Sequence, residues 1–242
     1  MKNKLLNPIN LVALIAFGAL QTACVGPNRQ VMTKSAHPAE IGNLMEKAEK
    51  GDAKSQFSLA VKYRKGEGIG KNEAEAVKWY RKAALNKFAP AQHNLGECYY
   101  LGECGLPEDD AQAVEWYRKA ANQNYAYSQF RLGGHYLLGH GVPKNEVEAV
   151  KWFRKAAEQG MGAAQNDLGT CYLFGTGVIK DYVEAYKWIL LGASTASTGC
   201  NDLDKKRANV RILEAHMSPG QIAEGKRRAR NFKAHWLGDK IY

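Results

Sequence analysis

Glu75-Ala-Val-Lys-Trp-Tyr-Arg-Lys-Ala-Ala84 returns three more times along the chain, with small changes. The later copies read Gln112-Ala-Val-Glu-Trp-Tyr-Arg-Lys-Ala-Ala121, Glu148-Ala-Val-Lys-Trp-Phe-Arg-Lys-Ala-Ala157 and the more divergent Glu184-Ala-Tyr-Lys-Trp-Ile-Leu-Leu-Gly-Ala193. Their tryptophans, Trp79, Trp116, Trp152 and Trp188, are 37, 36 and 36 residues apart. A fixed period of this length indicates an array of stacked repeats, which usually offers a binding surface rather than a catalytic centre.

Each repeat contains two amphipathic segments. The first is seen in Ser55-Gln-Phe-Ser-Leu-Ala-Val-Lys-Tyr63, where a small residue, a leucine, a second small residue and a tyrosine fall at i, i+4, i+5 and i+8. The second places Ala76, Trp79, Tyr80 and Ala83 at i, i+3, i+4 and i+7. Both spacings describe one face of a helix. The sequence therefore predicts helical hairpins whose small residues allow close approach and whose tryptophans are buried between the helices.

Glycine pairs separate the two helices of a repeat, as in Gly66-Glu-Gly68, Gly139-His-Gly141 and Gly175-Thr-Gly177. Glycine readily adopts the left-handed conformation that ends a helix, and the Asn or Asp that follows a few residues later is a good N-cap. Phosphate-binding loops need a preceding strand and a Lys-Ser/Thr pair, which these turns lack. We therefore interpret the glycine pairs as helix stop signals.

The repeated pattern Leu-Gly-x-x-Tyr, Gly-x-Gly and Glu-Ala-x-Lys-Trp-Tyr-x-Lys-Ala-Ala resembles the Sel1-like repeat, a relative of the tetratricopeptide repeat. The resemblance implies an all-α, right-handed α-solenoid. Residues 39–197 are expected to hold a partial helix, Ala39–Lys50, and four units, the fourth degenerate after Trp188. The end resembles a terminal helix pair, seen in Met217-Ser-Pro-Gly-Gln-Ile-Ala-Glu224 and Arg227-Arg-Ala-Arg-Asn-Phe232. Residues 198–242 are thus expected to form capping helices with a basic tail.

The N-terminus has the features of a targeting segment. Lys2 and Lys4 precede an apolar run from Leu11 to Leu20, which is too short to span a bilayer and is typical of a signal peptide. Leu20-Gln-Thr-Ala-Cys24 resembles a bacterial lipoprotein signal, although Gln21 departs from it. We expect a signal peptide at residues 1–23, a lipidated Cys24 and a flexible tether over 24–38. The protein would then face the periplasm on a lipid anchor; the alternative is ordinary cleavage to a soluble periplasmic or secreted product.

The remaining cysteines give one candidate pairing. Cys98 lies near the end of a first helix, and Cys104 lies in a single-residue insertion beside it, so a disulfide between them is possible. Cys98 and Cys171 occupy the same column two repeats apart and cannot pair within one array. Cys171 and Cys200 are expected to be free thiols. The sequence has no paired Cys-x-x-Cys and no histidine at ligand spacing from a cysteine pair, so no metal site is expected.

The net charge of +10 is concentrated in the tail. Residues 201–242 contain ten basic and five acidic residues. Lys226-Arg-Arg-Ala-Arg230 has little aromatic character around it, so a nucleic-acid partner is not expected. The simplest interpretation of this segment is a solvated helix face.

A partner surface is expected on the first helices, which line the concave side in the tetratricopeptide relatives. The variable columns between the framework residues would face this groove and bind another protein, since exposed aromatic residues make good anchors. The alternative is that some of them are buried against the neighbouring repeat. The candidate residues are Phe57, Val61, Arg64, His93, Glu97, Tyr100, Tyr127, Phe130, Leu137, Asn166, Thr170 and Leu173. The glutamine column of Gln56, Gln92, Gln129 and Gln165 is expected to bind loop backbone rather than a ligand.

Catalytic motifs are not found. No Ser or Thr has a Lys three residues later, and Lys-Thr-Gly, nucleophile-elbow and zinc-protease motifs are missing. No catalytic residue, cofactor or small-molecule substrate is therefore expected. The family resemblance implies an envelope adaptor or regulator, or an immunity protein that occludes an antibacterial lipase effector with anchors among Phe57, Tyr100 and Phe130. A β-lactam-interacting enzyme, discussed for some cysteine-rich relatives, is the remaining alternative.

Overall fold

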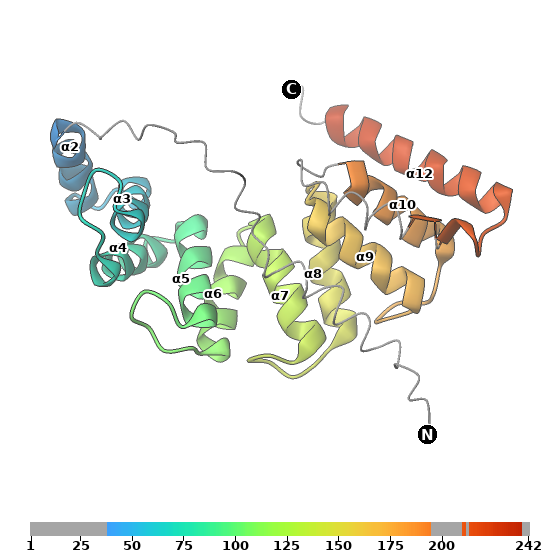
Figure 1. The fold of residues 1–242 in the computed structure, drawn as a ribbon, viewed down its shortest axis with the longest axis horizontal. Coiled ribbons are helices and arrows are strands. Elements are labelled where there is room, and N and C mark those ends of the chain that lie inside the picture. Colours follow the sequence, from blue (N-terminus) through green and yellow to red (C-terminus); the bar gives the residue numbers. More distant parts are fainter. Residues whose placement is uncertain (1–37, 195–209, 212, 239–242) are drawn as a thin grey trace, which may run out of the picture. The chain divides into compact units, whose positions relative to one another are not determined.

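The structure is a computed structural model that describes residues 38–194, 210–211 and 213–238. The chain divides into two compact parts, with the boundary between Lys144 and Asn145, and each is described by itself. All regular elements in the described residues are α-helices, as the sequence predicts (Figure 1). The expected signal peptide, the lipidation site Cys24, most of the tether and Cys200 lie outside the described residues.

The first part is a series of antiparallel helices, each packed against the next along the chain. The partial helix that precedes the array is α2, and α3/α4 and α5/α6 form the first two hairpins; α7 begins the third repeat. The bounds are α2 Pro38–Glu49, α3 Ala53–Lys65, α4 Glu73–Leu85, α5 Ala89–Leu101, α6 Asp110–Ala121 and α7 Ala126–Leu138.

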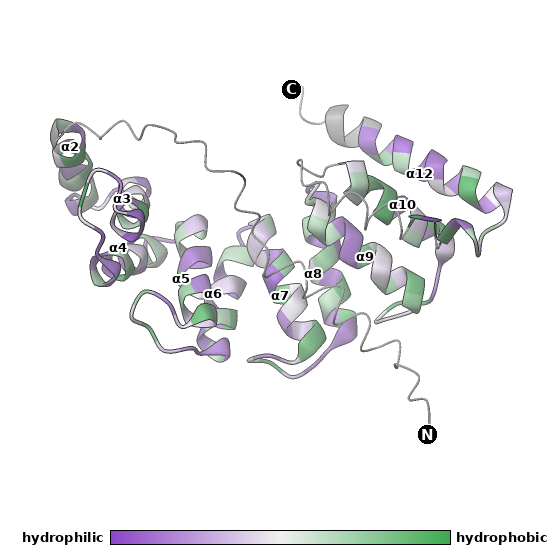
Figure 2. Cartoon of the chain, in the orientation of Figure 1, coloured by the Kyte–Doolittle hydropathy of each residue, from purple (hydrophilic) through white to green (hydrophobic). Residues whose placement is uncertain are grey.

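The second part continues the same pattern with α8 Glu146–Glu158, α9 Gly162–Phe174 and α10 Tyr182–Ser194. Helix α12, Pro219–Gly238, packs against α10. Figure 2 shows that the helices carry both hydrophobic and hydrophilic residues, as one-sided packing requires.

Helix ends follow the predicted signals. Gly66, Gly139 and Gly175 adopt left-handed φ values of 74°, 79° and 75°, and each donates its N–H to a carbonyl of the last turn. The side chains of Asn72 and Asn145 accept hydrogen bonds from backbone N–H groups in the first turn of the next helix, both at 3.0 Å. These contacts satisfy backbone groups that a helix end leaves free. The interpretation of the glycine pairs as stop signals is therefore confirmed.

Small residues let the two helices of a hairpin approach closely. A Cβ atom on Gly96 would lie 2.7 Å from the Tyr117 ring, and one on Gly169 would lie 2.6 Å from Ile189. Trp79, Trp152 and Trp188 are buried as expected, whereas Trp116 is only half-buried. The correction for Trp116 concerns degree alone, because its ring still packs against the core of the first part.

The glutamine column is structural, as predicted. Gln92 Nε2 donates to Ala84 O at 3.0 Å, in the last turn of the preceding second helix. Gln56, Gln129 and Gln165 make the same bond to Ala48, Ala121 and Ala157. Each glutamine thus satisfies a helix-terminal carbonyl and joins one repeat to the next. The bond from Gln56 shows that α2 stands where the second helix of a preceding repeat would stand.

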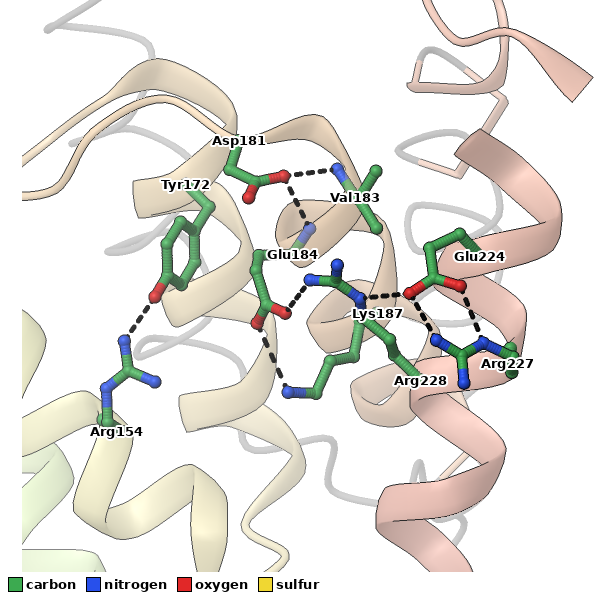
Figure 3. Close-up of polar contacts among 9 residues, drawn as sticks. All are labelled: Arg154, Tyr172, Asp181, Val183, Glu184, Lys187, Glu224, Arg227 and Arg228. Atoms are coloured by element: carbon green, nitrogen blue, oxygen red, sulfur yellow. Dashed lines mark hydrogen bonds and ion pairs between the residues drawn. The ribbon is translucent and has the colours of Figure 1, made fainter. Parts of the chain in front are cut away.

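Helix α12 is held on α10 by charge and by close packing (Figure 3). Arg228 donates to Glu184 at 2.8 Å and to Glu224 at 2.7 Å. Gly225 leaves room for Tyr186, whose ring would lie 2.8 Å from an added Cβ. Ser218 caps the helix ahead of Pro219, as expected.

One expectation for the C-terminal region needs correction. Of the two segments predicted to form a terminal helix pair, Met217–Glu224 enters α12 at Pro219 and Arg227–Phe232 lies wholly in the same helix. No helix-breaking residue separates them, and the glycine between them is accommodated by close packing. Residues 210, 211, 213 and 214 ahead of α12 are also helical.

Candidate functional site

Two of the candidate residues, Phe57 and His93, fill equivalent positions between helices in successive repeats. The Phe57 ring lies 5.8 Å from Tyr80 and 5.4 Å from Phe88, measured between ring centroids. His93, one repeat later, lies 5.7 Å from Tyr117 and 5.4 Å from Tyr125. Each therefore wedges between its own second helix and the start of the next first helix. This column contributes to inter-repeat packing, with only part of each ring left accessible.

Glu97 joins three helices of the first part. Its Oε1 accepts from the Tyr117 hydroxyl at 2.7 Å, and its Oε2 accepts from Arg131 at 2.5 Å. The three residues come from α5, α6 and α7. The side chains of Glu97 and Arg131 are only 16% and 21% exposed, so this ion pair is largely shielded from water. If one partner of such a pair moved away, the other charge would stay buried without compensation, which is costly. The two partners therefore hold each other in one geometry.

His93 stays neutral beside this ion pair. Burial is the main cause that lowers its pKa from 6.5 to about 4, and Glu97 only partly offsets this. The 3.9 Å separation of His93 Nε2 and Glu97 Oε1 is therefore not an ion pair at neutral pH. His93 Nδ1 instead forms a hydrogen bond with the buried Ser128 Oγ at 3.0 Å. Burial, and then the carboxylate, also raise the pKa of Tyr117, which keeps its hydroxyl a donor.

An exposed aromatic side chain stands on this scaffold. Tyr127 is 58% exposed, and its ring lies 5.7 Å from Tyr125 and 6.0 Å from His93. The guanidinium of Arg131 lies beside the Glu97 carboxylate and over the ring of Tyr100 at 5.5 Å. We call Tyr127, Tyr125, His93 and Arg131 together the Tyr127 surface.

Several other candidates contribute to packing. Phe57 and Val61 pack against the core of the first part, and Leu173 packs against that of the second. The exposure expected for Leu137 is wrong, because the residue is buried at 7%. It lies in the last turn of α7, where its side chain is covered. Arg64, Tyr100 and Phe130 are half-buried.

Asn166 and Thr170 lie on α9 in the second part. The Asn166 amide occupies the space left by Gly192 of α10, 2.5 Å from where a Cβ would stand. Thr170 Oγ1 donates to Asn166 O at 2.9 Å within its own helix. Both side chains are half-buried. The structure therefore gathers His93, Glu97, Tyr100 and Tyr127 of the twelve candidates and gives the others separate packing environments.

Two members of the Tyr127 surface, Tyr125 and Arg131, and several exposed apolar residues lie outside the predicted set. Tyr125 is the N-cap of α7, a position taken by Phe88 and Met161 in the neighbouring repeats. Because three repeats have an apolar or aromatic residue at this position, aligning the repeats could have identified Tyr125. Arg131 varies too strongly along its column to be found this way. Leu101 and Phe174, at the ends of first helices, are exposed apolar residues outside the predicted set.

The structure brings Cys98 and Cys104 together as expected. Their Sγ atoms are 3.1 Å apart, both residues are buried as thiols, and both belong to the core of the first part. The contact with Cys104 and burial raise the pKa of the Cys98 thiol. The disulfide itself stays a prediction. Cys171 is a buried free thiol, as expected.

The described residues contain neither a cluster of metal ligands nor a membrane-spanning helix. Within the part of the chain that the structure describes, no three His, Cys, Asp or Glu side chains cluster as metal ligands would. No helix in this part combines the length and apolar composition needed to cross a membrane.

The Sel1 repeat family matches residues 53–88, 89–125, 126–161 and 162–194, which is more than half of the chain. The repeating hairpins, the glycine stops and the glutamine caps thus define a Sel1-repeat solenoid, and the chain belongs to the Sel1 repeat family. Sel1 repeats generally mediate protein–protein binding, and their fold is typically a scaffold rather than an enzyme.

Two solved structures and one curated protein show the same similarity. The protective antigen c5321 of uropathogenic Escherichia coli, with an SLR fold, is 33% identical, with a TM-score of 0.72, covering 96% of this chain and 46% of its own. A Sel1 repeat protein from Oxalobacter formigenes is 32% identical, with a TM-score of 0.61, over 69% of this chain and 48% of its own. DAP3-binding cell death enhancer 1 of Rattus norvegicus is 40% identical over 58 residues, 24% of this chain and 11% of its own length. The chain therefore spans less than half the length of each.

Proposed function

We propose that the protein binds another protein through the Tyr127 surface and that it does so in the bacterial envelope. The observation that carries this proposal is the exposed Tyr127 ring held by half-buried neighbours from α5 and α7. Tyrosine and arginine are enriched among residues that dominate binding energy, and a tyrosine loses little conformational entropy on binding. A rigid, partly hydrophobic ring with a polar end is a suitable anchor for a protein partner.

The support beneath the ring favours a preorganised site. Glu97, Tyr117 and Arg131 link three helices by two short hydrogen bonds, so the backbone that carries Tyr127 has little freedom to rearrange. A surface that is already ordered loses less free energy on association. In the first repeat the position of Glu97 is occupied by Val61, and in the fourth by Thr170, so this support is particular to the α5–α7 region. A residue that varies between repeats on an otherwise repeated fold can distinguish one partner from another.

The envelope location and the nature of the partner are finer parts of the proposal. The apolar segment before Cys24 supports export and lipidation. Within that setting we propose an immunity role, in which the protein occludes an antibacterial lipase effector at the membrane where the lipase acts. The support is the family resemblance together with the anchoring sequence. A periplasmic adaptor that holds envelope or signalling proteins is the competing role.

Measured affinity tests the surface. A partner isolated by crosslinking from the envelope is titrated against the intact protein, Tyr127→Ala and Leu85→Ala. Leu85 is 73% exposed on α4 of the same compact part, and it serves as the matched control. We expect Tyr127→Ala to weaken binding by about 2 kcal/mol, roughly thirtyfold in Kd, and Leu85→Ala to change it by less than about 0.5 kcal/mol. Equal effects of the two substitutions would contradict the assigned surface.

A protection assay separates the immunity role from the adaptor role. Cells that express the protein and receive a periplasmic lipase effector should survive, and cells with the Tyr127→Ala variant should lose protection at equal protein levels. If the isolated partner is a cell-wall or signalling protein and no lipase is neutralised, the immunity role is refuted and the adaptor role is supported.

A further inference from the structure

The solvent-facing side of α12 is strongly basic. Lys226, Arg230 and Lys233 are all exposed and are spaced i, i+4 and i+7, so they lie on one face of the helix. From the first to the last they span about 10 Å along the helix axis. None of the three forms an ion pair with any residue in the described part of the chain. We call these three residues the basic face.

The side of α12 adjacent to the basic face is packed and fixes its orientation. Ile222 packs against the core of the second part, Ala229 is buried, and the Phe232 ring lies 5.2 Å from that of Trp188. Arg228 ties the same side to Glu184 of α10 (Figure 3). Because this side is packed on the repeat, the basic face is turned outward and held rigidly.

The surrounding charges do not neutralise the basic face. Glu224 is the acidic residue of α12 nearest to it, and its two oxygens are occupied by Arg227 and Arg228. Glu184, on the packed helix, is bound by Lys187 and Arg228. The helix dipole explains basic residues in a last turn, but Lys226 lies well before the end of the 20-residue helix. The positive charge is therefore not explained by stability within the fold.

The composition of the face favours a lipid surface over a macromolecular partner. A protein interface needs a large apolar or aromatic anchor at its centre. Among the residues of α12 up to Lys233, whose side chains the structure describes, the exposed neighbours of the basic face are Pro219, Ala223 and Arg227. Single-stranded nucleic acid needs aromatic platforms for stacking, and these residues provide none. Anionic headgroups need only basic point charges brought close to their plane, which attract them by about 1 kcal/mol each.

We propose that the basic face of α12 is a docking surface for an anionic phospholipid membrane. The face lies in the second part of the chain, on residues separate from the Tyr127 surface, so the proposal does not depend on the proposed function. It also does not require lipidation of Cys24, although an anchor and a basic patch together would give the two signals that stable membrane attachment needs.

Cosedimentation with vesicles tests the proposal on the full chain. Vesicles of phosphatidylglycerol mixed with phosphatidylcholine are compared with vesicles of phosphatidylcholine alone, which measure any binding through the apolar segment of residues 11–20. The test variant replaces Lys226, Arg230 and Lys233 by Gln. The control variant replaces the exposed Lys54, Lys65 and Lys78 by Gln and removes the same net charge from the first part. A charge-conserving variant exchanges Lys for Arg and Arg for Lys at the three positions of the basic face.

The expected results are specific to the anionic vesicles. The test variant should lose about a hundredfold in partitioning, since three residues at about 1 kcal/mol each are removed. The control should lose no more than a few-fold, and the charge-conserving variant should bind like the unaltered protein. Binding should also fall as salt rises, because the Debye length shortens to about 10 Å at 0.1 M. Equal losses in the test and control variants would overturn the proposal, as would an unchanged test variant. Far-ultraviolet circular dichroism confirms that each variant is folded.

Discussion

The neutral, buried state of His93 makes stability depend on pH in a defined window. Its pKa is about 4 in the folded protein, against 6.5 for an exposed histidine. Between these values the unfolded chain binds a proton that the folded protein does not bind. Stability is therefore lost as pH falls from 6.5 toward 4, and above 6.5 this residue has no effect on the pH dependence. A difference of about 2.5 pKa units corresponds to about 3 kcal/mol at the acidic end of the window.

His93→Phe isolates this contribution. Phe57 occupies the equivalent slot in the first repeat, so an aromatic ring without a titrating group fits there. The variant loses the hydrogen bond to Ser128, which should cost about 1 kcal/mol at every pH. Burial also lowers the pKa of His135, and this effect is present in both proteins and cancels in their difference.

Urea unfolding followed by circular dichroism, at a series of pH values from above 7 to near 4, measures the difference in stability. As pH falls from 6.5 toward 4, we expect the free energy of unfolding of His93→Phe to rise by about 3 kcal/mol relative to that of the unaltered protein. Nuclear magnetic resonance titration of the His93 ring provides an independent measurement of its pKa. Parallel stability curves, or a titration of this ring near 6.5, would refute the assignment of His93 as a buried neutral wedge.

Three further predictions concern packing, redox chemistry and anchoring. Gly96→Ala should destabilise the protein by about 1 to 2 kcal/mol because the added Cβ meets the Tyr117 ring. Gly134→Ala, whose Cβ meets nothing within 4 Å, should stabilise it by up to about 1 kcal/mol. Thermal unfolding compares the two variants, and an equal shift in both would refute close packing at Gly96. Air oxidation should join Cys98 and Cys104, with oxygen accepting the two electrons and the protein losing two hydrogen atoms by mass spectrometry. The bond should stabilise the protein by about 2 kcal/mol, and Cys104→Ser should abolish this gain; two free thiols after oxidation would contradict the pairing. Cys24→Ala should release the protein from membranes and block globomycin-sensitive processing, and unchanged membrane retention would count against lipidation.

The repeat pattern made the fold predictable because it aligned equivalent positions with one another. Ala76 and its equivalents are fully buried, as the alignment indicates. The glutamine column binds backbone as predicted, although the acceptors are helix-terminal carbonyls rather than loop groups. These residues make the same contacts in every repeat, so the four copies of the sequence together indicate whether the position is buried or exposed. The helix stops at Gly66 and Gly139 are predictable for the same reason.

The site was predicted less well because its residues vary between repeats. The alignment separated His93 and Tyr127 from the framework, but it did not show that His93 is a wedge and Tyr127 an exposed ring. That distinction depends on α7, because Tyr125 at its N-cap contacts His93 and its Arg131 pairs with Glu97. A single-column pattern cannot show which long side chains cross between repeats. Leu137 was misplaced for a related reason, since the equivalent Tyr100 and Leu173 are half-buried whereas Leu137 is buried.

Photo-crosslinking from position 127 tests the central claim most directly. A photoreactive phenylalanine analogue replaces Tyr127 in one protein and the comparably accessible control Leu85 in another, and both are irradiated in intact envelopes. A partner-binding Tyr127 surface predicts one protein band that crosslinks from position 127 and is missing or much weaker from position 85. The same bands at equal strength from both positions, or no protein crosslink from position 127, would contradict it.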